Sequence, residues 1–255
     1  MSHVDEYNEA MIASMDLIWG EGFMAPGGEG NVHNMVRGIE LKDKRVLDIG
    51  CGQGRPACIL ADTYGAQVVG TDLEEHLVQR SIRRARQAGL SDRTEFLRVE
   101  PGPLQFEDNS FDLVMSSGAF TQIEDKLGMY RECRRVLKPG GTLSCYDWMK
   151  TAGDYSADML YWFEVEGLTY AMKTAEEHQA LYLEAGFQRT EIDDRSAWFR
   201  RQVRLEYEQI STELRGDILD LLGHEDTAHF IEDWRAMMVV CEKGEMLQVY
   251  SRAYA

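Results

Sequence analysis

The chain has 255 residues, of which 44% are hydrophobic, and this is enough for the core of one large domain. Its formal net charge of -17 would repel the phosphates of nucleic acids and of anionic lipids, so the composition disfavours proteins that bind either. No apolar stretch reaches the roughly 18 residues of a membrane span, and no basic segment followed by an apolar run marks a secretion signal, so we expect a cytoplasmic protein.

Two helices are expected ahead of the first strand. Apolar side chains recur at helical spacing over residues 4–18. A glycine-rich stretch over 20–28 then interrupts the pattern. A second helix is expected from about Glu29 to Gly38, so that residues 1–40 form an N-terminal cap.

The segment 46–54, with sequence VLDIGCGQG, joins an apolar strand to three glycines at spacing two. Glycine lets the backbone turn tightly and approach a ligand where a Cβ would collide; these residues are Gly50, Gly52 and Gly54. Asp48 lies at the carboxyl end of the strand, where open α/β sheets bind ligands. A dinucleotide loop would need glycine where Arg55 stands, and a P-loop would need Gly-Lys-Ser/Thr. The motif therefore predicts a nucleotide-like cofactor that carries a cation.

Further strand ends follow at the spacing of alternating strands and helices. A β-branched strand ends at Asp72, about 20 residues after the first, where an acid can hold both ribose hydroxyls. The segment 95–101 includes Glu100, and the segment 111–117 ends in two serines. The run 136–143, with sequence VLKPGGTL, is a turn that leads into a fifth strand. This alternation predicts a doubly wound, mostly parallel sheet.

The pattern changes after the fifth strand. Residues 155–172 are dense in aromatic side chains, and a helix follows them. Sixth and seventh strands are expected at 187–193 and 247–254, separated by some fifty residues of helical periodicity. We expect the segments 151–185 and 194–244 to form helical lids above the carboxyl ends of the strands.

These strand-end motifs, in this order, resemble those of the class I S-adenosylmethionine-dependent methyltransferases. The resemblance implies a Rossmann-like methyltransferase fold of seven strands, with a cofactor-binding core over 41–150. It also implies S-adenosyl-L-methionine (AdoMet) as cofactor and S-adenosyl-L-homocysteine as product. Asp48 would then face the methionine ammonium, Asp72 the ribose and Glu100 the adenine amino group, where the family usually has Asp. The other core residues predicted to bind the cofactor are Gly50, Cys51, Gly52, Gly54, Leu73, Pro101, Ser116 and Ser117.

The ends of the chain look like the phosphoethanolamine N-methyltransferase group, which has the same helical insert before its last strand. The resemblance is carried by 18–28, Asp147-Trp148, 174–177 and the late helix that begins Asp233-Trp234. It implies that the N-terminal helix folds over cofactor and substrate. The residues predicted to cover the cofactor are Tyr7, Trp19, Phe23 and Met24.

The chain departs from that group in its catalytic residues. The group pairs an acid with a histidine just after the fourth strand, and here those positions hold Gly118 and Gln122. Trp148 replaces a tyrosine after the fifth-strand acid, and Leu168 stands where an arginine is expected. The predicted substrate contacts are Trp19, Glu21, Gly118, Trp148, Tyr161 and Tyr170. Their aromatic rings would form either a cage for an ammonium group or the core of the lid.

Methyl transfer from a sulfonium mainly requires the nucleophile and the methyl group at a distance of about 3 to 3.5 Å. An amine need only arrive neutral, whereas a hydroxyl or a carbon acid needs a positioned base. The predicted catalytic residues are Gln122, which can orient a substrate but cannot act as a base, and Asp147. His33 and His178 are possible bases, with a helical surface or core position as the alternative.

No metal is expected, because the six histidines show no metal-ligand spacing. The five cysteines are odd in number and contain no C-x-x-C, so they are interpreted as reduced thiols. We therefore expect one domain over 1–255 that methylates a small molecule, at the nitrogen of an amine or a heterocycle. The alternatives are O- or C-methylation of a natural-product intermediate, an AdoMet-binding module without catalysis and, more distantly, a dinucleotide-dependent dehydrogenase.

Overall fold

The computed structural model describes residues 7–168 and 170–255, and these form one seven-stranded sheet of order β3-β2-β1-β4-β5-β7-β6. The strands are β1 (Arg45–Ile49), β2 (Gln67–Asp72), β3 (Thr94–Arg98), β4 (Phe111–Ser117), β5 (Leu137–Lys150), β6 (Arg189–Asp194) and β7 (Met246–Tyr254). Strands β1 to β5 pair in parallel, whereas β7 runs antiparallel to both β5 and β6. The predicted doubly wound, mostly parallel sheet is thus confirmed.

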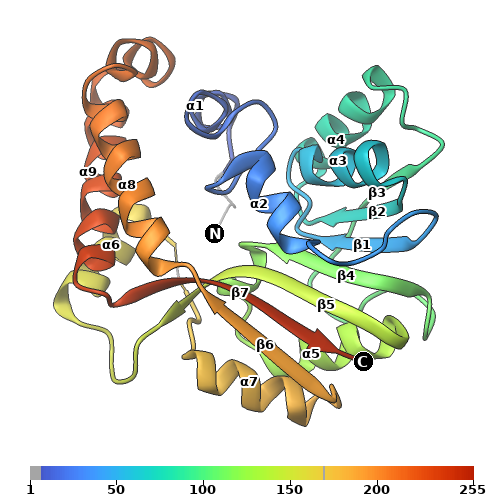
Figure 1. Cartoon of the computed structure of the whole chain (residues 1–255). Helices are drawn as coiled ribbons and strands as arrows, with labels where there is room; N and C mark the ends of the chain where they lie inside the picture. The colour runs from blue at the N-terminus through green and yellow to red at the C-terminus, as the bar shows by residue number, and fades with distance from the viewer. Residues whose placement is uncertain (1–6, 169) are drawn as a thin grey trace.

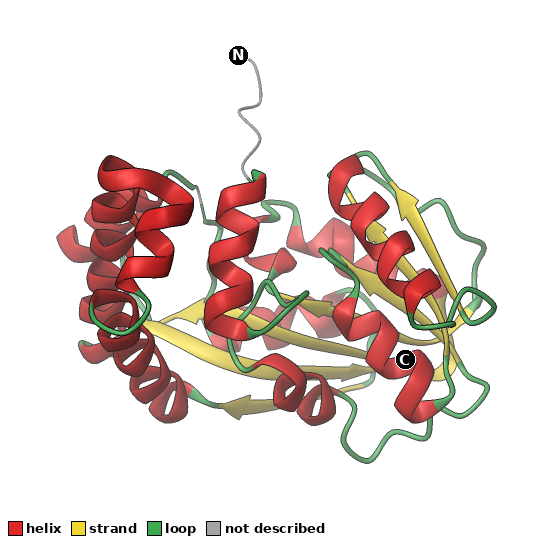
Figure 2. Ribbon diagram, turned by 90° about the horizontal axis from the view of Figure 1, so that it is seen from above, coloured by secondary structure: helices red, strands yellow, loops and turns green. Residues whose placement is uncertain are grey.

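Helices cover both faces of the sheet and extend beyond one end of it (Figure 1). They are α1 (Glu9–Trp19), α2 (Gly28–Met35), α3 (Arg55–Tyr64), α4 (Glu75–Gln87), the 3-10 helix η1 (Ala119–Gln122), α5 (Lys126–Val136), α6 (Ala157–Glu166), α7 (Ala175–Glu184), α8 (Ser196–Ser211) and α9 (Arg215–Glu242). Helices α2, α3 and α4 lie on one face, and α5 and α7 lie on the other. Seen from above, α1 stands between the sheet-flanking helices and the group of α6, α8 and α9 (Figure 2).

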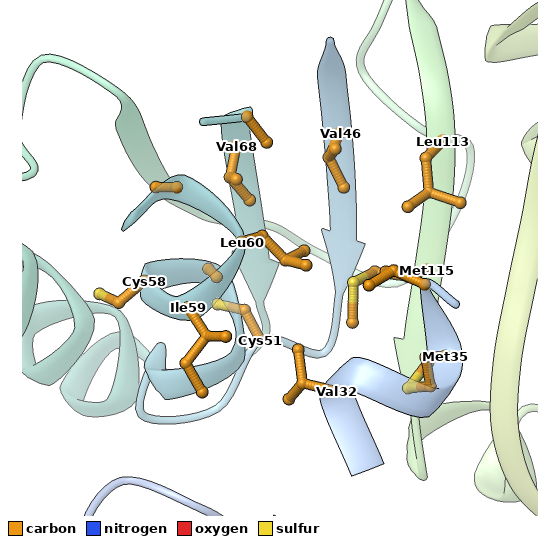
Figure 3. Packing of buried hydrophobic residues seen from close by; sticks show 14 of the residues in the cluster. Val32, Met35, Val46, Cys51, Cys58, Ile59, Leu60, Val68, Leu113 and Met115 are labelled. Carbon is orange, nitrogen blue, oxygen red and sulfur yellow. The ribbon is translucent and has the colours of Figure 1, made fainter. Parts of the chain in front are cut away.

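Alternation along the central strands fills both layers of the core. Successive strand residues point to opposite faces, so Val46 packs under α2 and α3 while its neighbour Leu47 packs on the other side. Figure 3 shows part of the first layer, in which Val46, Leu60 and Leu113 belong to one cluster. A strand buried on both faces needs mostly apolar residues, and this explains why β1 is apolar at Val46, Leu47 and Ile49, with only Asp48 as a buried polar residue.

A separate core joins α6, α8 and α9 and includes Trp162, Phe199 and Trp234. The fully buried carboxylate of Glu206 contacts this core. One of its oxygens accepts from the indole Nε1 of Trp19 at 3.0 Å and from Gln202 Nε2 at 2.8 Å, and the other accepts from Trp234 Nε1 at 3.2 Å. Because Trp19 ends α1 and the other donors lie on α8 and α9, this carboxylate ties the N-terminal helix to the insert.

Element boundaries differ from the expectations in a few places. Helix α2 ends at Met35 because Val36 already leaves the helical conformation, with φ -106° and ψ 6°. The insert contains two long helices, and the second includes Gly223 with φ 80° and ψ 176°, which breaks it into two segments. The expected helix over 4–18 falls partly outside the described residues. No helix in the described part of the chain is both long and apolar enough to cross a membrane.

Candidate cofactor and acceptor site

A cavity of about 620 Å³ lies at the carboxyl ends of β1, β2, β4 and β5, beneath α1 and beside α6. The N-terminal cap, the loop 99–106 after β3, the 3-10 helix η1 and β7 also contribute to its walls. Most of the residues predicted from the sequence line it: Tyr7, Trp19, Met24, Gly50, Gly52, Asp72, Leu73, Glu100, Pro101, Ser117, Gly118, Gln122, Asp147, Trp148 and Tyr170. Segments far apart in the sequence are therefore brought together at one cavity.

A much smaller cavity, of about 30 Å³, adjoins the first and shares with it Met24, Ala25, Gly50, Gly52 and Ser117. Asp48 and Cys51, both predicted cofactor residues, line this second space. Four other predicted residues line neither cavity: Gly54, Ser116, Glu21 and Tyr161. Gly54 instead starts α3, in the left-handed conformation at φ 78°.

The loop after β1 approaches its neighbours as closely as its glycines allow. The amides of Gly50 and Cys51 both donate to the Thr71 carbonyl, at 2.8 and 3.0 Å. A Cβ on Gly52 would lie 2.8 Å from the sulfur of Met24, which belongs to the N-terminal cap. Glycine is needed here because the cap packs directly on the loop backbone.

Three buried acceptors in the small cavity have no hydrogen-bond donor among the described residues. They are Asp48 Oδ2, Asn31 Oδ1 and Gln53 Oε1. Leaving buried polar atoms unpaired is costly, and an ammonium group offers three N–H donors to such a set. Burial, reinforced by Asp72, raises the pKa of Asp48 to about 7, as expected for a carboxyl that lacks its cation. The residues present therefore fit the methionine end of AdoMet.

We expect binding of S-adenosylhomocysteine at pH 6 to release protons. Asp48 is largely protonated at that pH in the empty protein, and a neighbouring ammonium favours its ionised form. Calorimetry in buffers of different ionisation enthalpy should report a release approaching about one proton, which declines toward pH 8. The Asp48→Asn variant should lose this release, and equal heats in all buffers for the unchanged protein would contradict the assignment.

Asp72 is held rigidly at the end of β2. Its Oδ2 accepts from the Gly52 amide at 2.8 Å and its Oδ1 from the Glu74 amide at 3.0 Å, while burial raises its pKa. This carboxylate thus links the glycine loop to the second strand at the cavity wall. Glu100 lies at the cavity edge, where it is exposed and paired with Arg98 at 2.7 Å.

Asp147 lies buried where β5 meets η1. Its Oδ1 accepts from the hydroxyl of Thr121 and from the Trp148 amide, the latter at 3.1 Å. Burial raises its pKa to about 6, although the Thr121 hydrogen bond and the Lys126 ammonium oppose the rise. The Lys126 ammonium also holds the turn itself, by donating to the carbonyls of Phe120 and Ile123 at 2.6 and 3.0 Å. The turn presents Gln122 to the cavity.

Neither candidate histidine lines the cavities. His178 lies in the core beneath the sheet, where its Nδ1 bonds the Tyr130 hydroxyl at 2.6 Å and burial lowers its pKa to about 3. His33 bonds Tyr64 at 2.7 Å on the surface of α2. Among residues 7–168 and 170–255, no three His, Cys, Asp or Glu side chains are grouped to hold a metal. All five cysteines are free and buried.

Aromatic side chains form one wall of the large cavity. Trp148 and Tyr170 line it, and Trp162 lies behind them with its ring stacked on Tyr170 at a centroid distance of 5.2 Å. Tyr161, by contrast, points outward, is 44% exposed and bonds Glu232 at 2.6 Å. The side chain of Glu21 is 82% exposed and pairs with Arg84 at 3.2 Å. The substrate contacts predicted for Tyr161 and Glu21 are therefore not found at the cavity.

The charged side chains among the described residues that line the large cavity are all acidic. No Arg, Lys or His occurs among the described residues that line the large cavity. Its acidic members are Asp72, Glu74, Glu100, Glu124, Asp147 and Glu166. Such a surface attracts cations and repels phosphate groups.

Among the polar residues of these walls that the sequence analysis missed are Asn31, Gln53 and Gln248. Gln53 lies inside the glycine motif, so its position was a usable signal. Asn31 comes from α2, and nothing in the pattern of that helix indicates that its amide would reach the Ser117 hydroxyl, to which Nδ2 donates at 3.2 Å.

Residues 47–145 match a family model described as a methyltransferase domain. Phosphoethanolamine N-methyltransferase 3 of Arabidopsis thaliana is 27% identical over 241 residues, which are 94% of this chain and 48% of that protein. A sterol 24-C-methyltransferase of Gibberella zeae is 33% identical over 170 residues, which are 64% of this chain and 44% of that protein. The chain thus spans about half the length of the curated relatives it matches.

Solved structures share the fold over almost the whole chain. Haemonchus contortus phosphoethanolamine N-methyltransferase 2, in complex with phosphomonomethylethanolamine and S-adenosylhomocysteine, matches with a TM-score of 0.90 at 22% identity, over 98% of this chain and 59% of that one. A candidate sarcosine dimethylglycine methyltransferase of Galdieria sulphuraria matches with a TM-score of 0.82 at 20% identity, over 96% of both chains.

Proposed function

We propose that this chain, of which residues 47–145 match a methyltransferase domain, uses S-adenosyl-L-methionine to methylate the nitrogen of a small amine or a nitrogen heterocycle. The observation that carries this proposal is the lining of the large cavity, which combines carboxylates with aromatic rings and has no basic side chain among its described members. An amine, protonated or neutral, is the acceptor whose charge and hydrogen bonding suit such walls.

We assign cofactor binding to residues that line the two cavities. Asp48, Asn31 and Gln53 would hold the ammonium group, and Asp72 would hold the ribose. The bound cofactor supplies a methyl group on a positively charged sulfur. The protein then needs to bring the acceptor nitrogen into line with that methyl group and to exclude water.

Asp147 and Gln122 are the side chains that we assign to the acceptor. Asp147 is mostly ionised at neutral pH, since its pKa is about 6, and its carboxylate can accept a hydrogen bond from an amine or take its proton. Gln122 can orient the acceptor but has no proton-accepting group of suitable pKa. An amine that loses its proton before binding needs no base in the transition state.

We expect Gln122→Ala to lower turnover by less than about 100-fold, which is below the upper range for removing a true general acid or base. The reason is that Gln122 acts by positioning alone. The measurement is steady-state turnover on an acceptor found by mass spectrometry after incubation of the protein and AdoMet with a mixed small-molecule extract. A loss of about 10⁴-fold with acceptor affinity intact would contradict catalysis by positioning.

C-methylation is the second candidate, because the chain is 33% identical to a sterol 24-C-methyltransferase over 170 residues. C-methylation and O-methylation would both require a side chain that takes a proton from the acceptor. Either reaction would make Asp147 essential as a proton acceptor, so Asp147→Asn should then cost far more turnover than Gln122→Ala. An AdoMet-binding module without catalysis would bind the cofactor and leave every component of the extract unmethylated.

We further propose that the chain acts as one domain in the cytoplasm, with residues 41–150 as its cofactor-binding core. Five buried, unpaired thiols support a reducing compartment. The continuous sheet supports one domain, because β6 and β7 from the last third of the chain pair alongside β5 of the core.

A further inference from the structure

Gln248 lies at the acceptor end of the large cavity, where the last strand meets the fifth. In the antiparallel pair of β5 and β7 it stands directly opposite Trp148. Directly opposed residues point to the same face of a sheet, and both side chains line the cavity. Gln248 therefore belongs to the same wall as the aromatic rings, although it lies a hundred residues further along the chain.

The orientation of the Gln248 amide is set by the backbone. Its Nε2 donates to the Asp147 carbonyl at 3.0 Å, and a carbonyl accepts only from the amino end of the amide. The oxygen Oε1 is left without a donor among the described residues, in a side chain that is only 1% exposed. A buried amide oxygen without a donor destabilises the protein, so a ligand that supplies an N–H donor removes this free-energy penalty and binds more tightly.

The donor must come from a ligand that the rest of the wall also accepts. Asp147 precedes Trp148 on β5, and Glu166, which also lines the cavity, is hydrogen-bonded to Tyr170, whose ring contacts that of Trp148. Carboxylates and an amide oxygen all act as acceptors, and the rings present the negative face of their π-systems. A phosphate group would bring charge of the same sign as these carboxylates, and no cationic side chain among the described lining residues compensates it.

Resting on the proposed function, we propose that Gln248 is a specificity-determining residue. Its Oε1 accepts a hydrogen bond from an N–H group of the methyl acceptor. The cavity thereby selects amines that carry an N–H and rejects phosphorylated acceptors.

The test measures binding and does not depend on turnover. Calorimetry with the full chain, saturated with S-adenosylhomocysteine, compares benzylamine, benzyltrimethylammonium and benzyl phosphate, which share one ring. The unchanged protein should bind benzylamine most tightly and should not bind benzyl phosphate. Gln248→Met, which keeps the length of the side chain but removes the acceptor, should weaken benzylamine by about tenfold. It should leave benzyltrimethylammonium, which has no N–H, within about twofold of its original affinity.

Gln188→Met makes the same change at an exposed position and should alter neither affinity. The melting temperature and the affinity for S-adenosylhomocysteine show whether Gln248→Met keeps the fold. If that variant does not fold, measurements on the unchanged protein test the proposal. The proposal is overturned if benzylamine and its trimethyl analogue bind with equal affinity, if benzyl phosphate binds more tightly, or if benzylamine does not bind. An equal loss for both amines in Gln248→Met also overturns it. Intact discrimination without methyl transfer would count against the proposed function alone.

Discussion

Replacing Asp72 by alanine is expected to weaken AdoMet binding by roughly 1 to 3 kcal/mol, the cost of leaving hydrogen-bonding groups unpaired. The carboxylate accepts from the amides of Gly52 and Glu74, and it lines the cavity at the position predicted for the ribose. Its removal therefore loosens the glycine loop and takes an acceptor away from the ligand. Isothermal calorimetry with AdoMet measures the change.

Two variants make this expectation specific. Asp72→Asn keeps one acceptor and should lose less affinity than Asp72→Ala. Asp92→Ala removes a carboxylate from an exposed loop and should leave AdoMet affinity unchanged. A folded Asp72→Ala protein that binds AdoMet as tightly as the parent would show that this carboxylate does not hold the cofactor.

Replacing Glu206 by alanine is expected to lower the free energy of unfolding by about 3 kcal/mol or more. The substitution leaves the indole N–H groups of Trp19 and Trp234 and the amide of Gln202 without their acceptor, each at about 1 to 3 kcal/mol, and adds a small void. Urea unfolding followed by circular dichroism measures the loss.

The neighbouring Glu208→Ala is the matched control, because Glu208 lies on the exposed side of the same helix. Glu206→Gln keeps one oxygen and should lose less stability than Glu206→Ala. Equal losses in Glu206→Ala and Glu208→Ala would contradict the role of Glu206 as a buried acceptor.

The stability of the parent protein should also depend on pH through Glu206. Burial raises the pKa of Glu206, so the native state binds this proton more tightly than the unfolded chain does. The free energy of unfolding should therefore fall as pH rises from the unfolded pKa of Glu206, about 4.3, through its raised folded value. Glu206→Gln should reduce this dependence.

The fold could be predicted because its determinants are local. Apolar runs that end in an acid or a glycine identify strands whose ends carry ligands, and Asp48 and Asp72 lie at such ends. Their places at the cavity walls follow from the parallel pairing of β1 with β2, which brings adjacent carboxyl ends to one edge. A single short motif thus positions several side chains at once.

The acceptor wall could not be predicted in the same way, because it depends on how distant segments pack. Tyr161 and Trp162 are neighbours in one aromatic run, yet a helix turns about 100° per residue, so one faces solvent and the other the core. Composition alone does not indicate which of the two rings faces the core. Gln248 enters the wall only through the register of an antiparallel pair, and that register is set by contacts along the whole of β5 and β7.

The acidic lining of the large cavity also bears on the rates at which ligands arrive. A net charge of -17 attracts cations from a distance, and the carboxylates around the cavity direct that attraction toward one opening. Because the field of exposed charges is screened beyond about 10 Å in 0.1 M salt, association of a cationic ligand should be fastest in dilute buffer and should slow as salt is added. Dissociation, which is governed by short-range contacts inside the cavity, should change much less. The same charges that select the ligand would thus also shorten the time it needs to find the protein.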